Sequence, residues 1–93
     1  MIIGTLTVEL FIFGSRTLKD KRRVLKSILD RVKSKFNVSI AEIDGHDRWQ
    51  RSVLGIACVS NQVTHAQSVL SNVEKFISLQ GDAEIVSLHT EII

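Results

Sequence analysis

The sequence contains no proline and no tyrosine, and it has only one cysteine and one tryptophan among its 93 residues. Without proline, the chain can have neither a cis-proline turn nor a proline-rich linker. The single Cys58 cannot form a disulfide within the chain, and we expect it to be a small buried side chain in a strand. A chain that lacks disulfides suits a reducing compartment, so a cytoplasmic protein is the simplest expectation.

Long hydrophobic stretches are also missing. Residues 1–13 are mostly apolar, but they include Glu9 and lack the basic start of a signal peptide. Residues 52–73 contain no Asp, Glu, Lys or Arg, yet several polar side chains interrupt them. That polarity excludes a transmembrane helix, and no contact with a membrane is expected. The length suits one domain with a modest core, so we predict a single domain over residues 1–93.

Two periodicities in the apolar residues predict the secondary structure. Residues 2–13, 38–43, 50–60 and 83–93 alternate with the two-residue period of strands, and the third of these is apolar on both sides, as in a central strand. Residues 18 to about 36 and 63 to about 80 have apolar residues at helical spacing. Thr17 is the expected cap of the first helix, and Gly81 is expected to close the second.

The order strand–helix–strand–strand–helix–strand favours one architecture because crossovers between parallel strands are right-handed. We predict an α+β fold, namely a ferredoxin-like βαββαβ sandwich with a four-stranded antiparallel sheet and two helices on one face. In the last strand, Val86, Leu88 and Ile92 should face the helices. The opposite face of that strand should then be open, with the side chains of Ser87, His89 and Glu91.

The open face of the predicted sheet has few aromatic residues. Phe11 is the only one on its central strands, so stacking of RNA bases on the sheet is not favoured. Small and moderately apolar residues occupy most of the remaining positions. This composition suits a homodimer in which the open face packs against a second copy about a twofold axis.

Positive charge is concentrated in residues 16–35, which contain nine Lys or Arg and two Asp, whereas the whole chain has a net charge of only +2. Several of these residues recur at intervals of three and four and therefore form one stripe on the first helix, opposite its apolar face. Such a stripe is typical of a surface that contacts phosphates. We predict that RNA phosphates are bound by Arg16, Lys19, Arg23, Lys26 and Lys33. The alternatives are a solvated basic face without a ligand, and contact with an acidic protein.

Polar residues also gather between the second and third predicted strands. A second contact is predicted for Asp44, Asp47, Trp49 and Arg51. Side chains that can bind a divalent metal also occur here, at Glu42, Asp44, His46 and Asp47. Their spacing matches no specific metal motif, so we assign no metal, no cofactor and no catalytic residue. An ordinary exposed turn, a small-ligand site and an enzyme that uses the Glu42–Asp47 loop remain alternatives.

Two segments resemble a known family. They are Ser15-Arg16-Thr17-Leu18-Lys19-Asp20-Lys21-Arg22-Arg23, and Ala41-Glu42-Ile43-Asp44 followed by Asp47-Arg48-Trp49-Gln50-Arg51. Together they resemble the YlxP-like family of small uncharacterised bacterial proteins, and the resemblance covers essentially the whole chain. It implies a ferredoxin-like fold and genes that lie beside those for translation initiation and ribosome maturation factors. It implies no catalytic residue.

The charge pattern and the resemblance together suggest a function. We expect an uncharacterised translation- or ribosome-associated accessory protein that contacts ribosomal or other structured RNA through its basic first helix. Such binding should weaken steeply with salt and show little sequence preference. The alternative is a homodimeric ligand-binding or interaction module that uses the open sheet face and has no affinity for nucleic acid.

Overall fold

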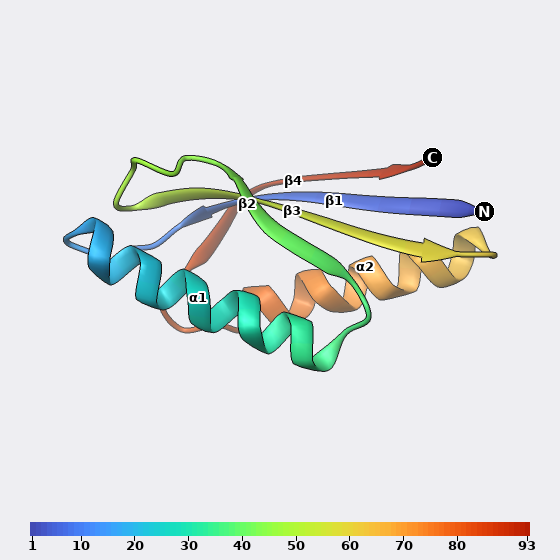
Figure 1. Cartoon of the computed structure of the whole chain (residues 1–93), viewed down its shortest axis with the longest axis horizontal. Helices are drawn as coiled ribbons and strands as arrows, with labels where there is room; N and C mark the ends of the chain where they lie inside the picture. Colours follow the sequence, from blue (N-terminus) through green and yellow to red (C-terminus); the bar gives the residue numbers. More distant parts are fainter.

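The computed structural model describes residues 1–93. Its elements are β1 (Ile2–Phe11), α1 (Leu18–Lys35), β2 (Ser39–Asp44), β3 (Arg51–Ser60), α2 (Val63–Ser78) and β4 (Glu84–Ile92). The strands form one antiparallel sheet in the order β2-β3-β1-β4, and both helices cover the same face of it (Figure 1). This arrangement confirms the predicted α+β, ferredoxin-like βαββαβ sandwich. No helix has both the length and the apolar character required to cross a bilayer.

The core lies between the two helices and the inner face of the sheet. Strand alternation in β1 buries Leu6, Val8 and Leu10 on that face and leaves Thr5 and Thr7 on the outer face. Strands β1 and β3 are central, as expected from a third strand that is apolar on both sides. Their outer face is not covered by any element of the chain (Figure 1).

Helix α1 begins where the sequence predicts. The Oγ1 atom of Thr17 accepts a hydrogen bond from the backbone N–H of Asp20 at 3.1 Å, so Thr17 is the N-cap. The inner face of the helix buries Leu25, Ile28 and Val32, at the expected spacing. The same face buries Lys21, a charged residue that the sequence pattern placed with the exposed basic segment.

Helix α2 ends earlier than the sequence predicts. Its last residue is Ser78, and its C-cap, Leu79, keeps a right-handed helical conformation. Gly81 lies in the following turn without a positive φ, since only Gly45 has one. The prediction that Gly81 closes the helix is therefore wrong. The chain leaves the helix through a turn that does not need the left-handed conformation of glycine.

Strand β4 keeps its predicted faces over most of its length. Ser87, His89 and Glu91 lie opposite outward-facing residues of β1, which confirms their position on the open side. The prediction for Val86 is wrong. Val86 is the extra, unpaired residue of a bulge, and Ile85 pairs with Leu10 in the inward position. A bulge adds one residue to one strand and so shifts the alternation of its faces.

Candidate functional site

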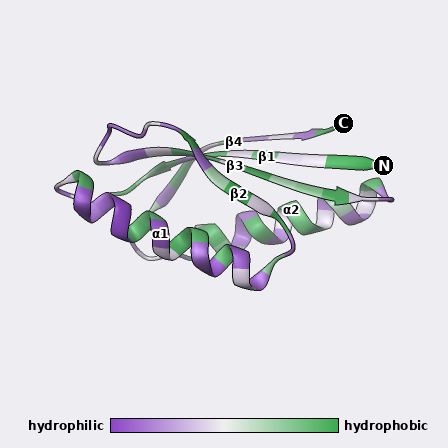
Figure 2. Ribbon diagram, viewed as in Figure 1, coloured by the Kyte–Doolittle hydropathy of each residue, from purple (hydrophilic) through white to green (hydrophobic).

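The start of α1 and the loop between β2 and β3 lie at the same end of the molecule, on the left in Figure 1. Lys21 of α1 donates a hydrogen bond from Nζ to the carbonyl oxygen of Gly45. Gln50 donates from Nε2 to the carbonyl oxygen of Ser15 at 3.3 Å, and its own carbonyl accepts from the N–H of Ile12 at 2.8 Å. The two predicted contact regions are thus joined, and Figure 2 shows hydrophilic residues over both.

A buried ion pair fixes this junction. The Nζ atom of Lys21, whose side chain is only 1% exposed, lies 2.9 Å from Oε2 of Glu42. The hydroxyl of Ser52 donates to the same oxygen at 2.6 Å. The other oxygen, Oε1, lies 3.8 Å from Nε2 of His46. Because a buried charge is costly without its partner, these contacts hold α1, the end of β2 and the start of β3 in fixed positions.

Strand alternation and a bulge at the end of β2 place Glu42 and Asp44 on opposite faces of the sheet. Glu42 pairs with β3 on the inner face, whereas Asp44 pairs with Val53 on the outer face, and Ile43 is the extra residue of a bulge between them. Gly45 follows with a φ of 79°, a conformation that glycine adopts without the strain of a side chain. The two neighbouring acidic residues therefore point to opposite sides of the sheet.

The opposite directions of Glu42 and Asp44 bear on the metal ligands that were considered from the sequence. No group of three or more His, Cys, Asp or Glu side chains is placed so that it could hold a metal ion. Glu42 is engaged by Lys21 and Ser52 on the helix side. The acidic residues of the loop are close in sequence but do not form one cluster of ligands.

Four of the predicted phosphate-binding residues lie on the exposed side of α1, and Arg16 lies just before the helix. All five are exposed, namely Arg16, Lys19, Arg23, Lys26 and Lys33. Only Lys26 has an ion pair, with Nζ 2.7 Å from Oδ2 of Asp30. The hydrogen bond from Lys26 lowers the pKa of Asp30, and the same bond raises the pKa of Lys26. The stripe therefore has three cations without an ion-pair partner, Lys19, Arg23 and Lys33, and a fourth, Lys26, that is paired with Asp30. Arg16, before the helix, has no ion pair either.

The second predicted contact divides into two parts. Asp44 and Arg51 line a polar hollow of about 220 Å³, and the residues that complete its lining include Glu9 and Arg48. Asp47 is exposed and does not line this hollow. Trp49 does not line it either, and it is an exposed residue, at 45%.

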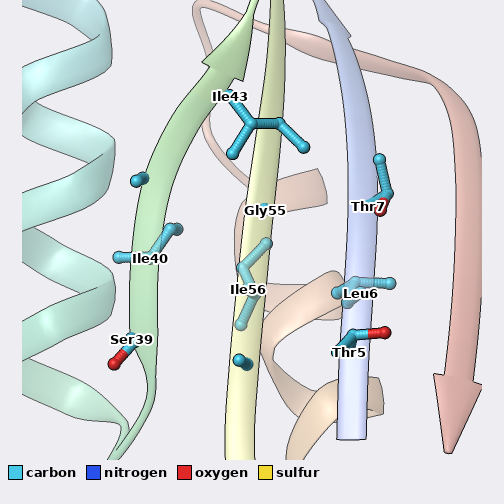
Figure 3. A pocket seen from close by; sticks show the side chains of 10 residues that line it. Thr5, Leu6, Thr7, Ser39, Ile40, Ile43, Gly55 and Ile56 are labelled. Carbon is cyan, nitrogen blue, oxygen red and sulfur yellow. The ribbon is translucent and has the colours of Figure 1, made fainter.

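A second hollow of about 350 Å³ lies on the outer face, between β1, β3 and β2. It is mostly apolar, and Figure 3 shows Thr5 and Thr7 at one side and Ile43 at the other. The side chain of Ile43 lies over Gly55, where a Cβ atom would come within 3.0 Å of it. The absence of a side chain at Gly55 thus makes room for Ile43.

Sequence reasoning missed the buried Lys21 and the contribution of Glu9 and Arg48 to the polar hollow. A signal for Lys21 was present, since it lies four residues before Leu25 and seven before Ile28, on the same helical face. The charge of Lys21 favoured an exposed position for its side chain, whereas its spacing from Leu25 and Ile28 favoured a buried one. No signal of this kind joins Glu9 to Arg48, because they belong to segments far apart in the chain.

Two solved structures are similar to this chain in fold. The "De novo designed protein Foldit4" has a TM-score of 0.57 at 15% identity, covering 98% of this chain and 97% of that one. A de novo designed protein with ferredoxin fold, LFR1 1, has a TM-score of 0.52 at 14% identity, covering 99% and 85%. At such low identity these likenesses show the fold alone.

Sequence similarity identifies the family. The "Uncharacterized protein YlxP" of Bacillus subtilis (strain 168) is 43% identical over 90 residues, covering 97% of this chain and 98% of that protein. This match confirms the resemblance to the YlxP-like family. Residues 3–90 also match the family described as "Protein of unknown function (DUF503)". A match over nearly the whole chain places this protein in that family, and the chain therefore belongs to the DUF503 family of proteins of unknown function.

Proposed function

We propose that this protein is a translation- or ribosome-associated accessory protein that binds structured RNA through its phosphates, using Arg16 and the stripe on α1. The observation that supports the proposal is the exposure of all five basic residues, four of which have no carboxylate oxygen within 4.0 Å of the charged side-chain nitrogens. Each cation that neutralises a phosphate releases condensed counterions, and this release favours binding at low salt.

The length of the stripe fits a nucleic-acid backbone. Lys19 and Lys33 are fourteen residues apart, which corresponds to about 21 Å along a helix that rises about 1.5 Å per residue. That span covers several phosphates of one strand. Lys and Arg side chains on an exposed helix contact phosphates without reading bases, so this surface should distinguish few sequences.

The proposal is tested by the salt dependence of binding to ribosomal RNA fragments. For the wild type, the logarithm of the association constant should decrease steeply as the logarithm of the salt concentration increases. In the triple variant Lys19→Gln, Arg23→Gln, Lys33→Gln, the magnitude of that slope should fall by about three, because each lost phosphate contact removes about one. Lys75→Gln on α2 is a control for a single exposed lysine outside the stripe and should change the slope little.

The ion pair within the stripe gives a second test. Lys26→Gln should weaken RNA binding less than Lys19→Gln, since Lys26 already shares its charge with Asp30. Asp30→Asn should strengthen binding, because it frees Lys26 and removes a repulsive carboxylate. RNA binding that does not depend on salt, or a triple variant that binds like the wild type, would contradict the proposal.

A homodimeric interaction module is the second candidate function, and the apolar hollow on the outer face favours it. A twofold interface is one patch that meets itself, so the same patch must offer both a hollow and protruding side chains. Ile43 and Val59, 55% and 67% exposed, protrude from the outer face and could fill the hollow of a partner. The 35 residues of the four strands, at about 3.3 Å per residue and with strands about 4.8 Å apart, give a face of about 550 Å², below the standard of about 800 Å² per partner.

The dimer is tested by light scattering at micromolar concentrations. The wild type should have the mass of a dimer, and Ala57→Arg should reduce it to that of a monomer, because the arginine would lie in the hollow. Ser71→Arg, an exposed position on α2, is the matched control and should leave the mass unchanged. A monomeric wild type at these concentrations would exclude this candidate.

A further inference from the structure

The polar hollow at the end of the sheet is not used by the phosphate stripe. Its lining comes from β1, the end of β2, the following loop and the start of β3, and consists of Glu9, Asp44, Gly45, Arg48, Arg51, Ser52 and Val53. Its volume of about 220 Å³ is below the range of about 300–1,000 Å³ that is usual for sites of drug-sized ligands. The hollow therefore suits a single small group.

One wall of the hollow is held in place by contacts within the protein. The Nη1 atom of Arg51 lies 3.3 Å from Oε1 of Glu9. The guanidinium carbon of Arg51 lies 5.6 Å from the ring centroid of Phe11, within the range of a cation–π contact. A guanidinium plane fixed from two sides is a surface on which a nucleobase can stack.

Two other groups of the hollow keep free hydrogen-bonding capacity. Oδ1 of Asp44 accepts from the backbone N–H of Gly45 at 2.8 Å, whereas no hydrogen bond or ion pair engages Oδ2. Arg48 is exposed, and no carboxylate oxygen lies within 4.0 Å of its guanidinium. The hollow thus offers the free Oδ2 of Asp44, whose two lone pairs can accept two hydrogen bonds, and a set of donors on Arg48.

The charges of the lining restrict the ligand. Glu9 and Asp44 repel a free anion, and Arg48 and Arg51 repel a cation, so a neutral group with both acceptors and donors fits best. Guanine has such groups on two edges. Its O6 and N7 atoms are a pair of acceptors that arginine binds in a bidentate manner. Its N1–H and N2 amino group are donors that a carboxylate can accept. No other common base offers the O6 and N7 acceptor pair.

We propose that this hollow binds an unpaired guanine of an RNA strand. Arg48 donates to O6 and N7, Asp44 accepts from N1–H and N2, and the base stacks on Arg51. The proposal rests on the proposed RNA binding for the strand that supplies the base. The hollow adjoins the start of α1, since Gly45 of its lining accepts a hydrogen bond from Lys21. Lys21 is on the buried face of α1, so a strand bound at the start of the stripe would pass around this end of the molecule to reach the hollow.

The test uses short single-stranded RNAs that are identical except for one central base, at constant salt, with binding followed by fluorescence anisotropy. The wild type should prefer guanine to adenine by about tenfold, as expected for one bidentate contact. Replacement of the guanine by 7-deazaguanine removes N7, and replacement by hypoxanthine removes the N2 amino group. Each replacement should lose most of the preference.

Two variants assign the contacts to residues. Arg48→Gln should no longer distinguish guanine from 7-deazaguanine, and Asp44→Asn should no longer distinguish guanine from hypoxanthine. The Asn side chain keeps an oxygen for the N–H of Gly45, so the loop should remain folded. Asp47→Asn is the matched control, because Asp47 is an exposed acid of the same loop outside the hollow, and it should keep the full preference.

The outcomes separate this proposal from the RNA proposal on which it rests. Equal binding of all four RNAs with a steep salt dependence would overturn the guanine site and leave the phosphate stripe intact. If the wild type binds no RNA, the proposed function fails, and the neutral nucleoside guanosine is then titrated while the backbone amides of residues 44–53 are observed by NMR. Shifts of these amides that are absent with adenosine would support the guanine site, and their absence would overturn it as well.

Discussion

Replacing Lys21 with methionine removes the charge of the buried ion pair but keeps a side chain of similar length. In this variant the Glu42 carboxylate, only 16% exposed, loses its cation and keeps the hydroxyl of Ser52 as a hydrogen-bond donor. Breaking a buried pair from one side typically costs about 3–5 kcal/mol. Because Glu42 keeps some contact with solvent, we expect the free energy of unfolding to fall by about 3 kcal/mol, the lower end of that range.

Urea unfolding at neutral pH measures this change. Trp49 is the only tryptophan, and it lies in the loop that the pair holds, so its fluorescence reports on the affected region. The dependence of the free energy on urea should stay the same, which would show that stability and not compactness has changed. Lys33→Met is the matched control, because Lys33 is exposed on the same helix, and it should change the free energy by less than about 0.5 kcal/mol.

The double variant Lys21→Met, Glu42→Leu tests whether the two charges act as a unit. Replacing both members of a buried pair by apolar groups is often neutral or stabilising, so the double variant should be more stable than Lys21→Met alone. If Lys21→Met behaves like the exposed control, Lys21 is solvated and does not fix the junction. If the free energy of unfolding falls in the double variant by the sum of the decreases in Lys21→Met and Glu42→Leu, the two charges are not coupled.

Three further predictions concern local features of the fold. Thr17→Ala should lower the free energy of unfolding by about 1 kcal/mol through loss of the N-cap, as measured by chemical denaturation. Gly45→Ala should lower it by about 1–2 kcal/mol, since its φ is 79° and the new Cβ would lie 3.2 Å from a backbone oxygen. Gly14→Ala, with open space around it, should change it by less than about 0.5 kcal/mol. NMR titration should give Asp30 a pKa below its ordinary value and Lys26→Ala should raise it. The stabilisation by this pair is present above the unfolded pKa of Asp30 and is lost as the pH falls through the lower, folded pKa.

The sequence by itself determined the elements of the fold and the sides of the helix and strands that face the core. Alternation in residues 2–13 and helical spacing from Leu18 are local patterns, and each places a residue inward or outward without reference to the rest of the chain. The exposure of Lys19, Arg23, Lys26 and Lys33 follows from that period alone. The cap at Thr17 could be predicted for the same reason, because its hydrogen bond spans only three residues.

Only the tertiary structure decided which of these residues meet. Lys21 and Glu42 are separated by twenty residues and become partners because α1 packs against the end of β2, on the face where strand alternation places Glu42. The bulge that follows Glu42 turns Asp44 to the opposite face. The polar hollow combines Glu9 with Arg48 and Arg51 for the same reason. A bulge or a close approach of two elements depends on the packing of the whole sheet and helices, and no local period in the sequence encodes it.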